Sequence, residues 1–254
     1  IPLVVYIPEK FRHLAPPEYR AGGKSDRLVS FVDLAPTMLS LAGIKPPEWM
    51  HGHAFLGRFQ EGPQPYVYGF RGRMDERYDL LRSVTDGRYV YVRNYMPHLI
   101  YGQYLDYMFQ MPTTRVWRRL FDEGKLKAPQ TYFWQTKPAE ELYDLEGDHD
   151  EVRNLIASPQ HQIILSRLRT AQQHLALKIR DLGFLAESDL HRRSIGTTMY
   201  DMGQVQLKYP LDRILAMADL ASSSKPNTLA QLVRGLADND SGVRYWAAMG
   251  LLMR

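Results

Sequence analysis

The sequence predicts an α/β protein that combines a small antiparallel sheet, a long helix and a helical C-terminal segment. β-branched and aromatic runs flank Asp86-Gly87, which is the strongest short signal for a hairpin. Apolar residues at helical spacing over residues 159–182 predict the long helix. An apolar run over residues 1–7 predicts a further, buried strand. These features place the strands ahead of the long helix, with shorter helices after it.

The composition is that of a globular protein, and it excludes several kinds of site. The chain has 254 residues, 44% of them hydrophobic, which is enough for one large domain or two small ones. Its 32 Lys and Arg against 28 Asp and Glu give a net charge of +4, but no run of five like charges occurs, so we expect no nucleic-acid binding. The absence of Cys excludes disulfides, thiolate metal sites and a Cys nucleophile from these residues. No apolar stretch approaches the roughly 18 residues that a membrane span needs.

The first sixty residues are predicted to hold one strand and one short helix. Pro8 stops the apolar run, and a loop rich in Pro and Gly follows it. Asp33 is a candidate N-cap for a helix that ends at Gly43. We expect this helix to carry its apolar residues on one face, formed by Leu34, Met38, Leu41 and Ala42.

The middle of the chain is predicted to form a sheet with one long helix. The hairpin at Asp86-Gly87 is followed by an aromatic insert with a short helix over residues 113–123, and by a third strand within the stretch "ELYDL". Tyr and Trp residues between positions 104 and 134 are expected to pack as a small hydrophobic core. The long helix should bury a stripe formed by Ile163, Ile164, Leu168, Ala171, Leu175 and Ile179.

The last seventy residues change in character twice. Residues 184–209 show little periodicity and are predicted to be a linker. Residues 210–254 are predicted to form three short helices, the last two of which resemble the helical pair of a HEAT-like repeat. One such pair cannot bury its own apolar face, so a further repeat or a protein partner is expected there. Because the chain begins inside one apolar run and stops inside an apolar helix, we expect it to be part of a longer protein.

Four stretches together resemble one family, the type I, formylglycine-dependent sulfatases of the alkaline phosphatase superfamily. They are "IPLVVYIP", "SDRLVSFVDLAPTMLSLAGIKPPEWMHGHAFLG", "LLRSVTDGRYVYVRNY" and "ELYDLEGDHDEVRNLIAS", with His149 where the family usually has Pro. Their order and spacing agree with the family over about residues 1–180. The aromatic insert, which includes "RNYMPHLIYGQYLDYMFQMP", looks most like the sulfamidase and heparan-sulfatase-like branch.

The resemblance implies an architecture and an activity. It implies that residues 1–60 are the end of the catalytic domain at the edge of its large sheet, and that residues 61–183 are the antiparallel C-terminal subdomain. It implies hydrolysis of sulfate esters or N-sulfates, with a sulfated carbohydrate or another small sulfate ester as substrate. A periplasmic or secreted location would also agree with the family, with a signal peptide upstream.

The catalytic parts that the resemblance implies have no matching motif in this chain. The family uses a formylglycine nucleophile made from Cys or Ser in C/S-x-P-x-R, and a calcium ion held by Asp and Asn. Ser224 is followed by Pro at the right spacing but has Thr228 where Arg belongs. The turn around Asp148 and Asp150 is expected to be a solvated turn rather than a metal site. We therefore expect neither catalytic residues nor calcium ligands here.

Seven residues remain as candidates for substrate binding. Arg73, Asp75 and Glu76 lie together in "RGRMDERYD", where carboxylates could accept from a sugar hydroxyl or amine and the guanidinium could bind a second anionic group. A second group offers hydrogen-bond donors and a stacking face for a sugar ring, and it consists of His98, Tyr101 and Gln103. His51, a residue of a predicted turn, completes the set. His51 and His53 have the H-x-H spacing of metal ligands, but no third ligand lies near them in the sequence.

Two other functions agree with the same residues. A phosphodiesterase or phosphonate monoester hydrolase of the superfamily would share this half of the fold, because fold alone does not determine chemistry. A non-catalytic interaction module, built from a sulfatase-derived subdomain and helical repeats, belongs to a different class. The nucleophile motif upstream would distinguish the first from a sulfatase, and domain boundaries that coincide with the ends of the chain would favour the second.

Overall fold

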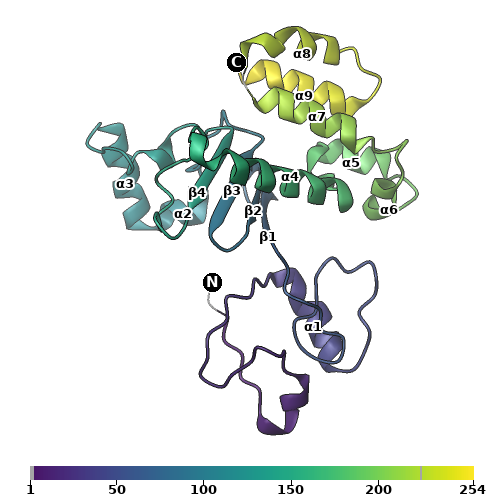
Figure 1. Cartoon of the computed structure of the whole chain (residues 1–254). Coiled ribbons are helices and arrows are strands. Elements are labelled where there is room, and N and C mark those ends of the chain that lie inside the picture. Colours follow the sequence, from purple (N-terminus) through teal and green to yellow (C-terminus); the bar gives the residue numbers. More distant parts are fainter. Residues whose placement is uncertain (1–2, 224) are drawn as a thin grey trace. The chain divides into compact units, whose positions relative to one another are not determined.

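The computed structural model describes residues 3–223 and 225–254, except for the side chain of Met74, and it divides into two compact units (Figure 1). Unit 1 comprises the described residues up to Tyr68 together with Thr85–Arg88. Unit 2 comprises Gly69–Val84 and Tyr89–Arg254. The structure has the predicted α/β class, with a small antiparallel sheet and helices on either side of it in the sequence. No helix among the described residues is both long enough and apolar enough to cross a membrane.

Unit 1 contains three short helical elements, η1 (Glu9–Leu14), η2 (Phe31–Asp33) and α1 (Leu34–Leu41). The predicted strand over residues 1–7 is wrong for its described part, because residues 3–7 form no strand. A strand is stable only when its backbone groups pair with a neighbour, and within the described residues no strand lies beside this segment. Ile7 instead packs with Phe55 and Leu56 in a small core.

The face that α1 buries is mainly polar and consists of Pro36, Thr37 and Ser40; of the predicted apolar face, only Leu41 packs against the small core. Thr37 and Ser40 are buried, whereas Met38 is 66% exposed. The reason is a set of hydrogen bonds that holds a neighbouring turn against the helix: the Asp33 carboxylate accepts from His53 N at 2.8 Å and the Thr37 hydroxyl accepts from Phe55 N at 3.1 Å. These bonds satisfy backbone N–H groups that would otherwise be left buried and unpaired.

Unit 2 is built on a four-stranded sheet with the order β1-β2-β3-β4. Its strands are β1 (Val67–Met74), β2 (Arg77–Thr85), β3 (Tyr89–Asn94) and β4 (Glu140–Asp144). The predicted hairpin and third strand are both present, and β3 pairs with β4 in antiparallel register with Tyr91 opposite Leu142. Gly87 adopts a φ of 97°, which explains why the hairpin turn carries glycine there.

The aromatic insert between β3 and β4 contains α2 (Asp106–Gln110), α3 (Pro112–Asp122) and η3 (Tyr132–Trp134). The helix predicted over residues 113–123 is confirmed by α3. Trp134 is buried at the centre of a ring cluster with Phe109, Trp117, Phe121 and Phe133. The predicted core of the insert is therefore confirmed for its Trp residues, but the Tyr residues assigned to it are exposed: Tyr104, Tyr107 and Tyr132.

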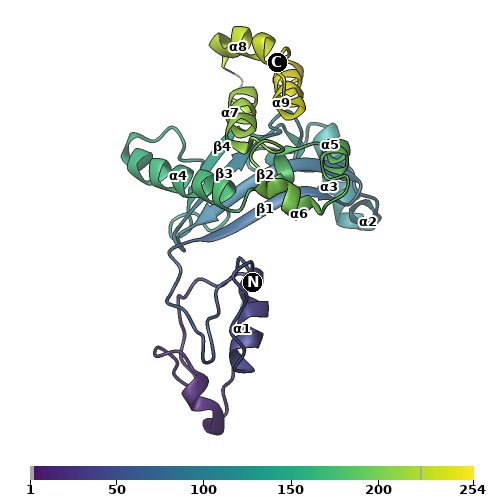
Figure 2. The ribbon, with the colours of Figure 1, turned by 90° about the vertical axis from the view of Figure 1, so that its right-hand side faces the viewer.

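The long helix is present as α4 (Gln162–Lys178), preceded by η4 (Pro159–His161). It contacts β3, and Figure 2 shows it crossing beside the strands. Its buried residues are Leu165, Leu168, Gln172 and Ala176. The predicted stripe shares only Leu168 with this set, and Ile163 is 85% exposed. Apolar residues cover a broad arc of this helix, so tertiary packing selects which side becomes buried.

The segment predicted as a linker, residues 184–209, is helical and packed. It carries η5 (Leu182–Phe184), α5 (Glu187–Arg193) and α6 (Met199–Gln204), and it buries Phe184, Leu185, Leu190, Met202 and Tyr209. These side chains are spaced irregularly because the elements are only about two turns long, so no helical period is visible in the sequence.

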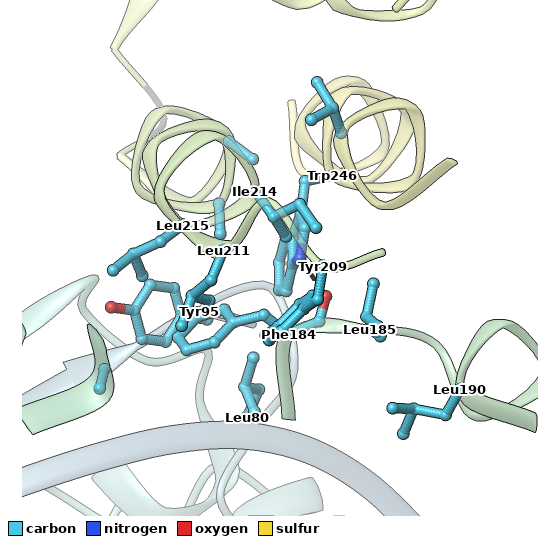
Figure 3. Close-up of a cluster of buried hydrophobic side chains, with 14 of the residues drawn as sticks. Leu80, Tyr95, Phe184, Leu185, Leu190, Tyr209, Leu211, Ile214, Leu215 and Trp246 are labelled. Atoms are coloured by element: carbon cyan, nitrogen blue, oxygen red, sulfur yellow. Dashed lines mark hydrogen bonds between the residues drawn. The ribbon is translucent and has the colours of Figure 1, made fainter. Parts of the chain in front are cut away.

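Three further helices follow as predicted: α7 (Leu211–Ser222), α8 (Leu229–Gly235) and α9 (Ser241–Leu252), with η6 (Pro226–Thr228) before α8. α7 packs against α9. Trp246 of α9 and Phe184 share one core with Leu80 of β2 and Tyr95, which directly follows β3 (Figure 3). The C-terminal helices are therefore part of the hydrophobic core that the sheet helps to form.

Candidate functional site

A pocket of about 390 Å³ lies on unit 2, and three of the predicted binding residues line it. Asp75 and Glu76 form the turn between β1 and β2, Arg73 lies at the end of β1, and Arg77 and Tyr78 begin β2. The opposite part of the lining is contributed by two C-terminal helices and consists of Ala186, Glu187 and Tyr245. Of the two predicted groups of binding residues, the one formed by Arg73, Asp75 and Glu76 therefore lines this pocket.

A tight turn between β1 and β2 presents the two carboxylates. Asp75 has a φ of +62°, a left-handed conformation that Asp tolerates better than most residues. Asp75 and Glu76 are both exposed. One Glu76 oxygen accepts from Asp106 N at 3.0 Å, at the start of α2. Among the residues that the structure describes, no protein group is bonded to the Asp75 carboxylate, so it is available to a ligand.

The two arginines of the pocket are directed toward backbone carbonyls. Arg73 Nη2 donates to the carbonyl oxygen of Leu185 and lies 3.5 Å from that of Gly183. The Arg73 guanidinium also lies over the Tyr78 ring, 5.4 Å from its centroid. Arg77 Nη1 lies 3.5 Å from the Tyr101 carbonyl oxygen. Arg73 thus ties the end of β1 to the segment before α5, which leaves fewer of its donors for an anion than the sequence suggested.

Tyr101 and Gln103 do not line this pocket. Three donors converge on the buried carboxylate of Glu141: Asn94 Nδ2 at 2.6 Å, the Tyr143 hydroxyl at 2.5 Å and the Tyr101 hydroxyl. Burial raises the pKa of the Tyr101 hydroxyl, and the charge of Glu141 raises it further. Gln103 Nε2 lies 3.3 Å from the Tyr78 carbonyl oxygen. Both side chains therefore have internal partners that hold the insert.

His98 lies beside a buried ion pair. Lys137 Nζ is 2.6 Å from Asp79 Oδ2, and the two side chains are 0% and 1% exposed. Burial lowers the pKa of His98, and the charge of Lys137 lowers it further. His98 Nδ1 is buried and has no hydrogen-bond partner among the described residues. The His98 side chain is half-buried and does not line the pocket of unit 2.

His51 belongs to unit 1 and is exposed, so it is not among the residues that line the pocket. His53 Nδ1 lies 2.8 Å from Glu61 Oε2, which gives this second histidine a local partner. Gly52, between them, lies so close to η2 that an added Cβ would be 1.9 Å from the Val32 carbonyl oxygen. The turn that carries both histidines is therefore fixed by its close contact with η2.

The described residues offer no set of ligands for a metal ion, since no three His, Cys, Asp or Glu side chains among them form a suitable group. Asp148 Oδ2 accepts from Arg153 N at 2.7 Å, as expected of a turn. The calcium ion that the family resemblance implies does not fit this part of the chain. Ser224 lies outside the described residues.

Glu187 and Tyr245 were not found from the sequence. They lie on α5 and α9, in segments predicted as a linker and as a repeat, and nothing in their local pattern connects them with residues 73–76. Only the packing of the C-terminal helices brings them to the pocket.

A second hollow, of about 470 Å³, lies along α3. Its lining includes Val116, Trp117, Leu120 and Leu126 and is mainly apolar. It contains no charged side chain and therefore matches a polar sugar less well than the first pocket does.

Two ulvan-active sulfatases of Formosa agariphila are similar to this chain in sequence. One is 37% identical over 190 residues, which are 74% of this chain and 30% of that protein. The other is 31% identical over 159 residues, which are 60% of this chain and 30% of that protein. The matched part of the chain thus spans 30% of the length of each relative. No protein-family model matches the chain. The similarity relates this chain to part of a sulfatase, as its motifs predicted.

Solved structures show a weaker similarity. A 2-O glycosaminoglycan sulfatase has a TM-score of 0.41 and 22% identity, over 63% of this chain and 27% of that one. A protein in complex with its substrate D-glucosamine-2-N,6-O-disulfate has a TM-score of 0.36 and 13% identity, over 59% of this chain and 24% of that one. These TM-scores are too low to support a residue-by-residue comparison of the sites.

Proposed function

We propose that the protein to which this chain belongs is a sulfatase that acts on sulfated sugars, and that this chain contributes to substrate recognition rather than to bond cleavage. The observation that carries the proposal is the 37% identity over 190 residues to an ulvan-active sulfatase. A sulfated polysaccharide such as ulvan is the substrate class that follows. We expect the nucleophile and the metal ligands to lie outside these 254 residues, because no C/S-x-P-x-R motif occurs in the sequence.

Within the chain, the pocket of unit 2 is the proposed recognition site. Asp75 and Glu76 would accept hydrogen bonds from sugar hydroxyls, since an ionised carboxylate offers only acceptors and forms charge-assisted bonds. Arg73, which the sequence suggested as an anion binder, is better regarded as a positioning residue, because its guanidinium holds the Leu185 carbonyl. Tyr101, Gln103 and His98 would support the insert from within.

The chemistry of the complete protein is part of the same proposal. A formylglycine nucleophile and a calcium ion would act from residues outside this chain, where calcium would supply Lewis-acid polarisation of the sulfate. We assign the chain to the sulfamidase and heparan-sulfatase-like branch on its aromatic insert, and the protein to the periplasm or the exterior of the cell. The domain limits at residues 60, 183 and 209 are sequence-based proposals, and those at 183 and 209 would not separate packed units, because residues 184–209 contribute to the core of unit 2.

The helices at the C-terminal end are proposed to begin a HEAT-like array. Apolar side chains remain exposed on the outer side of α8 and at the end of α9: Leu229, Val233, Leu236 and Leu252. Stacked helical repeats bury such residues against the next repeat. A further repeat or a protein partner would therefore cover this surface.

Sulfate release tests the proposed function. The full-length protein is incubated with an ulvan oligosaccharide, with a bis-aryl phosphate diester and with an aryl phosphonate monoester, and the inorganic sulfate or the aryl alcohol released is quantified. We expect sulfate release from the oligosaccharide by the full-length protein and none by the 254-residue chain. Turnover of a phosphorus substrate without sulfate release would favour the superfamily alternative. If the full-length protein turned over none of these substrates, the interaction module would be favoured.

A further inference from the structure

We propose that the pocket of unit 2 is a subsite for an unsulfated sugar unit, and that Glu187 and Tyr245 of the C-terminal helices determine this preference. The inference rests on the proposed function, and it specifies which part of the substrate binds in this pocket. The residues concerned lie in three separate stretches of the sequence that the fold brings together.

The charge of the pocket favours hydroxyl donors over sulfate. Asp75, Glu76 and Glu187 supply three carboxylates against the two guanidinium groups of Arg73 and Arg77. One nitrogen of each guanidinium group faces a backbone carbonyl oxygen, so both groups are partly engaged within the protein, and the pocket has one carboxylate more than it has guanidinium groups. A sulfate ester is an anion with acceptors only, whereas a sugar hydroxyl donates. Like charges and unpaired acceptors would therefore disfavour a sulfated ring here.

Tyr245 offers the pocket a rigid aromatic surface. It is half-buried on α9, and its ring packs edge-on against Trp246, with 5.4 Å between the centroids and an interplanar angle of 79°. Trp246 is itself fixed in the core, where its indole N–H donates to the Phe184 carbonyl oxygen at 2.8 Å. A tyrosine held in this way provides contact area for a sugar ring at little cost in conformational entropy.

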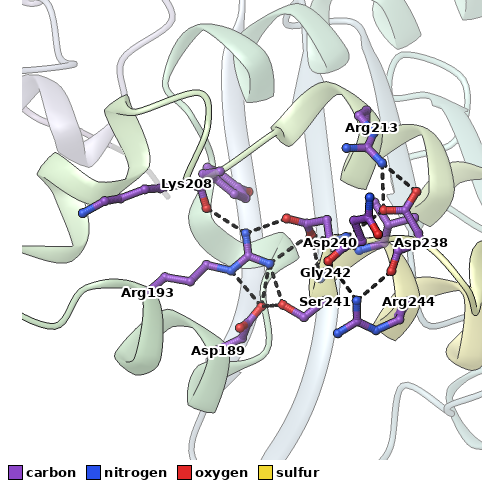
Figure 4. A network of polar contacts seen from close by, with 12 residues as sticks. Asp189, Arg193, Lys208, Arg213, Asp238, Asp240, Ser241, Gly242 and Arg244 are labelled. Carbon is purple, nitrogen blue, oxygen red and sulfur yellow. Dashed lines mark hydrogen bonds and ion pairs between the residues drawn. The ribbon is translucent and has the colours of Figure 1, made fainter.

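An ion-pair network sets the relative positions of Glu187 and Tyr245. Arg193 of α5 bonds both oxygens of Asp240, the N-cap of α9, at 2.9 Å each (Figure 4). It also bonds Asp189 Oδ2 at 2.9 Å and Ser241 Oγ at 2.7 Å. Glu187 is the first residue of α5, and Tyr245 follows the N-cap of α9 by about one turn. Arg193 is therefore a positioning residue for the pocket.

Calorimetric titration with a matched pair of probes tests the inference. The 254-residue chain is titrated with an ulvan oligosaccharide of defined length and with the same oligosaccharide after chemical desulfation. We expect the desulfated probe to bind about tenfold more tightly. Glu187→Gln should weaken binding of the desulfated probe about tenfold and reduce the discrimination, because one charge-assisted hydrogen bond is lost. Tyr245→Ala should weaken binding as well, whereas Tyr245→Phe should keep most of it.

Two controls match these variants. Glu9→Gln changes an exposed Glu in the first turn of η1, and Tyr200→Ala removes a half-exposed Tyr from α6; neither residue lines the pocket. Both should bind like the parent chain. If Tyr245→Ala does not fold, the Glu187→Gln variant still tests the inference, because Glu187 is exposed and its substitution should not affect folding.

Equal or tighter binding of the intact sulfated probe would overturn the inference, and so would a Glu187→Gln variant that binds like the parent. If the full-length protein released sulfate while this preference was absent, the inference alone would fail. If the preference was present but the full-length protein released no sulfate, the proposed function would fail instead.

Discussion

At the scale of single residues, the pair formed by Asp79 and Lys137 shows how unit 2 accommodates charge in its interior. Both side chains are almost completely buried and their charged atoms are 2.6 Å apart. Burial lowers the pKa of Lys137, while the hydrogen bond and the charge of Asp79 oppose the shift. A buried charge is tolerated when its partner stays in place and becomes costly when the partner is removed.

Lys137→Met should therefore destabilise unit 2 strongly. It leaves the Asp79 carboxylate buried without its cation, which typically costs about 3–5 kcal/mol of unfolding free energy. Lys125→Met is the matched control, because Lys125 pairs with Glu123 at the surface with its side chain 65% exposed. Chemical denaturation followed by circular dichroism measures both variants. Similar losses for the two lysines would contradict the assigned role of the buried pair.

At the scale of elements, the network around Arg193 joins α5 to the N-terminus of α9. Burial raises the pKa of Asp189 and Asp240, but hydrogen bonds from Arg193 outweigh it, so both pKa values lie below the usual range. A carboxyl whose pKa is lowered in the folded state contributes stability above its unfolded pKa, about 3.9 for Asp, and loses it as the pH falls through the folded pKa. The network should therefore stabilise unit 2 at neutral pH and weaken in acid.

Arg193→Ala should cost about 2–3 kcal/mol at pH 7, because charge-assisted hydrogen bonds in a poorly exposed site are lost. The variant should also lose less additional stability than the parent between pH 5 and pH 2, since its carboxyls no longer have lowered pKa values. Arg244→Ala is the control, because Arg244 donates to the backbone carbonyls of Asp238 and Asn239 and not to a carboxylate among the described residues. Unfolding curves at several pH values give the free energy of unfolding of each protein. If this free energy fell equally with pH for the parent and Arg193→Ala, the proposed role of the network in acid would be excluded.

Local signals in the sequence identified some elements and missed others for a physical reason. The Asp86-Gly87 turn is specified by its own two residues, because Gly87 needs a positive φ, so the hairpin was predictable. The buried face of α1 was not, because it depends on Asp33 and Thr37 bonding a turn twenty residues away. In the same way, Arg73, Asp75 and Glu76 share one loop and could be proposed together, whereas Glu187 and Tyr245 reach the pocket only through tertiary packing.

At the scale of the whole molecule, unit 2 has one core that extends from the sheet to α9. The sequence predicted a sheet with one long helix, followed by a linker over residues 184–209. The structure instead places Phe184, Leu185 and Trp246 in contact with the cluster that includes Leu80 of β2. The C-terminal helices should therefore unfold together with the sheet rather than before it.

Trp246→Ala tests this cooperativity. The side chain is completely buried, so truncation should cost about 3–5 kcal/mol. Hydrogen exchange should then increase in β2 and β3 as well as in α7 and α9, because one core supports them all. Trp49→Ala, in unit 1 and 64% exposed, is the control and should leave exchange in the sheet unchanged. Exchange that increases only in the C-terminal helices would show that these helices form a separate core.

The central claim is that this chain carries a recognition site of a sulfatase. Its most direct test is kcat/KM for sulfate release from an ulvan oligosaccharide by the full-length protein, compared between the parent, Asp75→Asn and Asp150→Asn. Asp75 lines the pocket with a free carboxylate, whereas Asp150 is an exposed turn residue outside it. We predict that Asp75→Asn lowers kcat/KM about tenfold, as expected for one charge-assisted hydrogen bond, and that Asp150→Asn leaves it unchanged. Equal kcat/KM values for all three proteins, or no sulfate release by the parent, would contradict the claim.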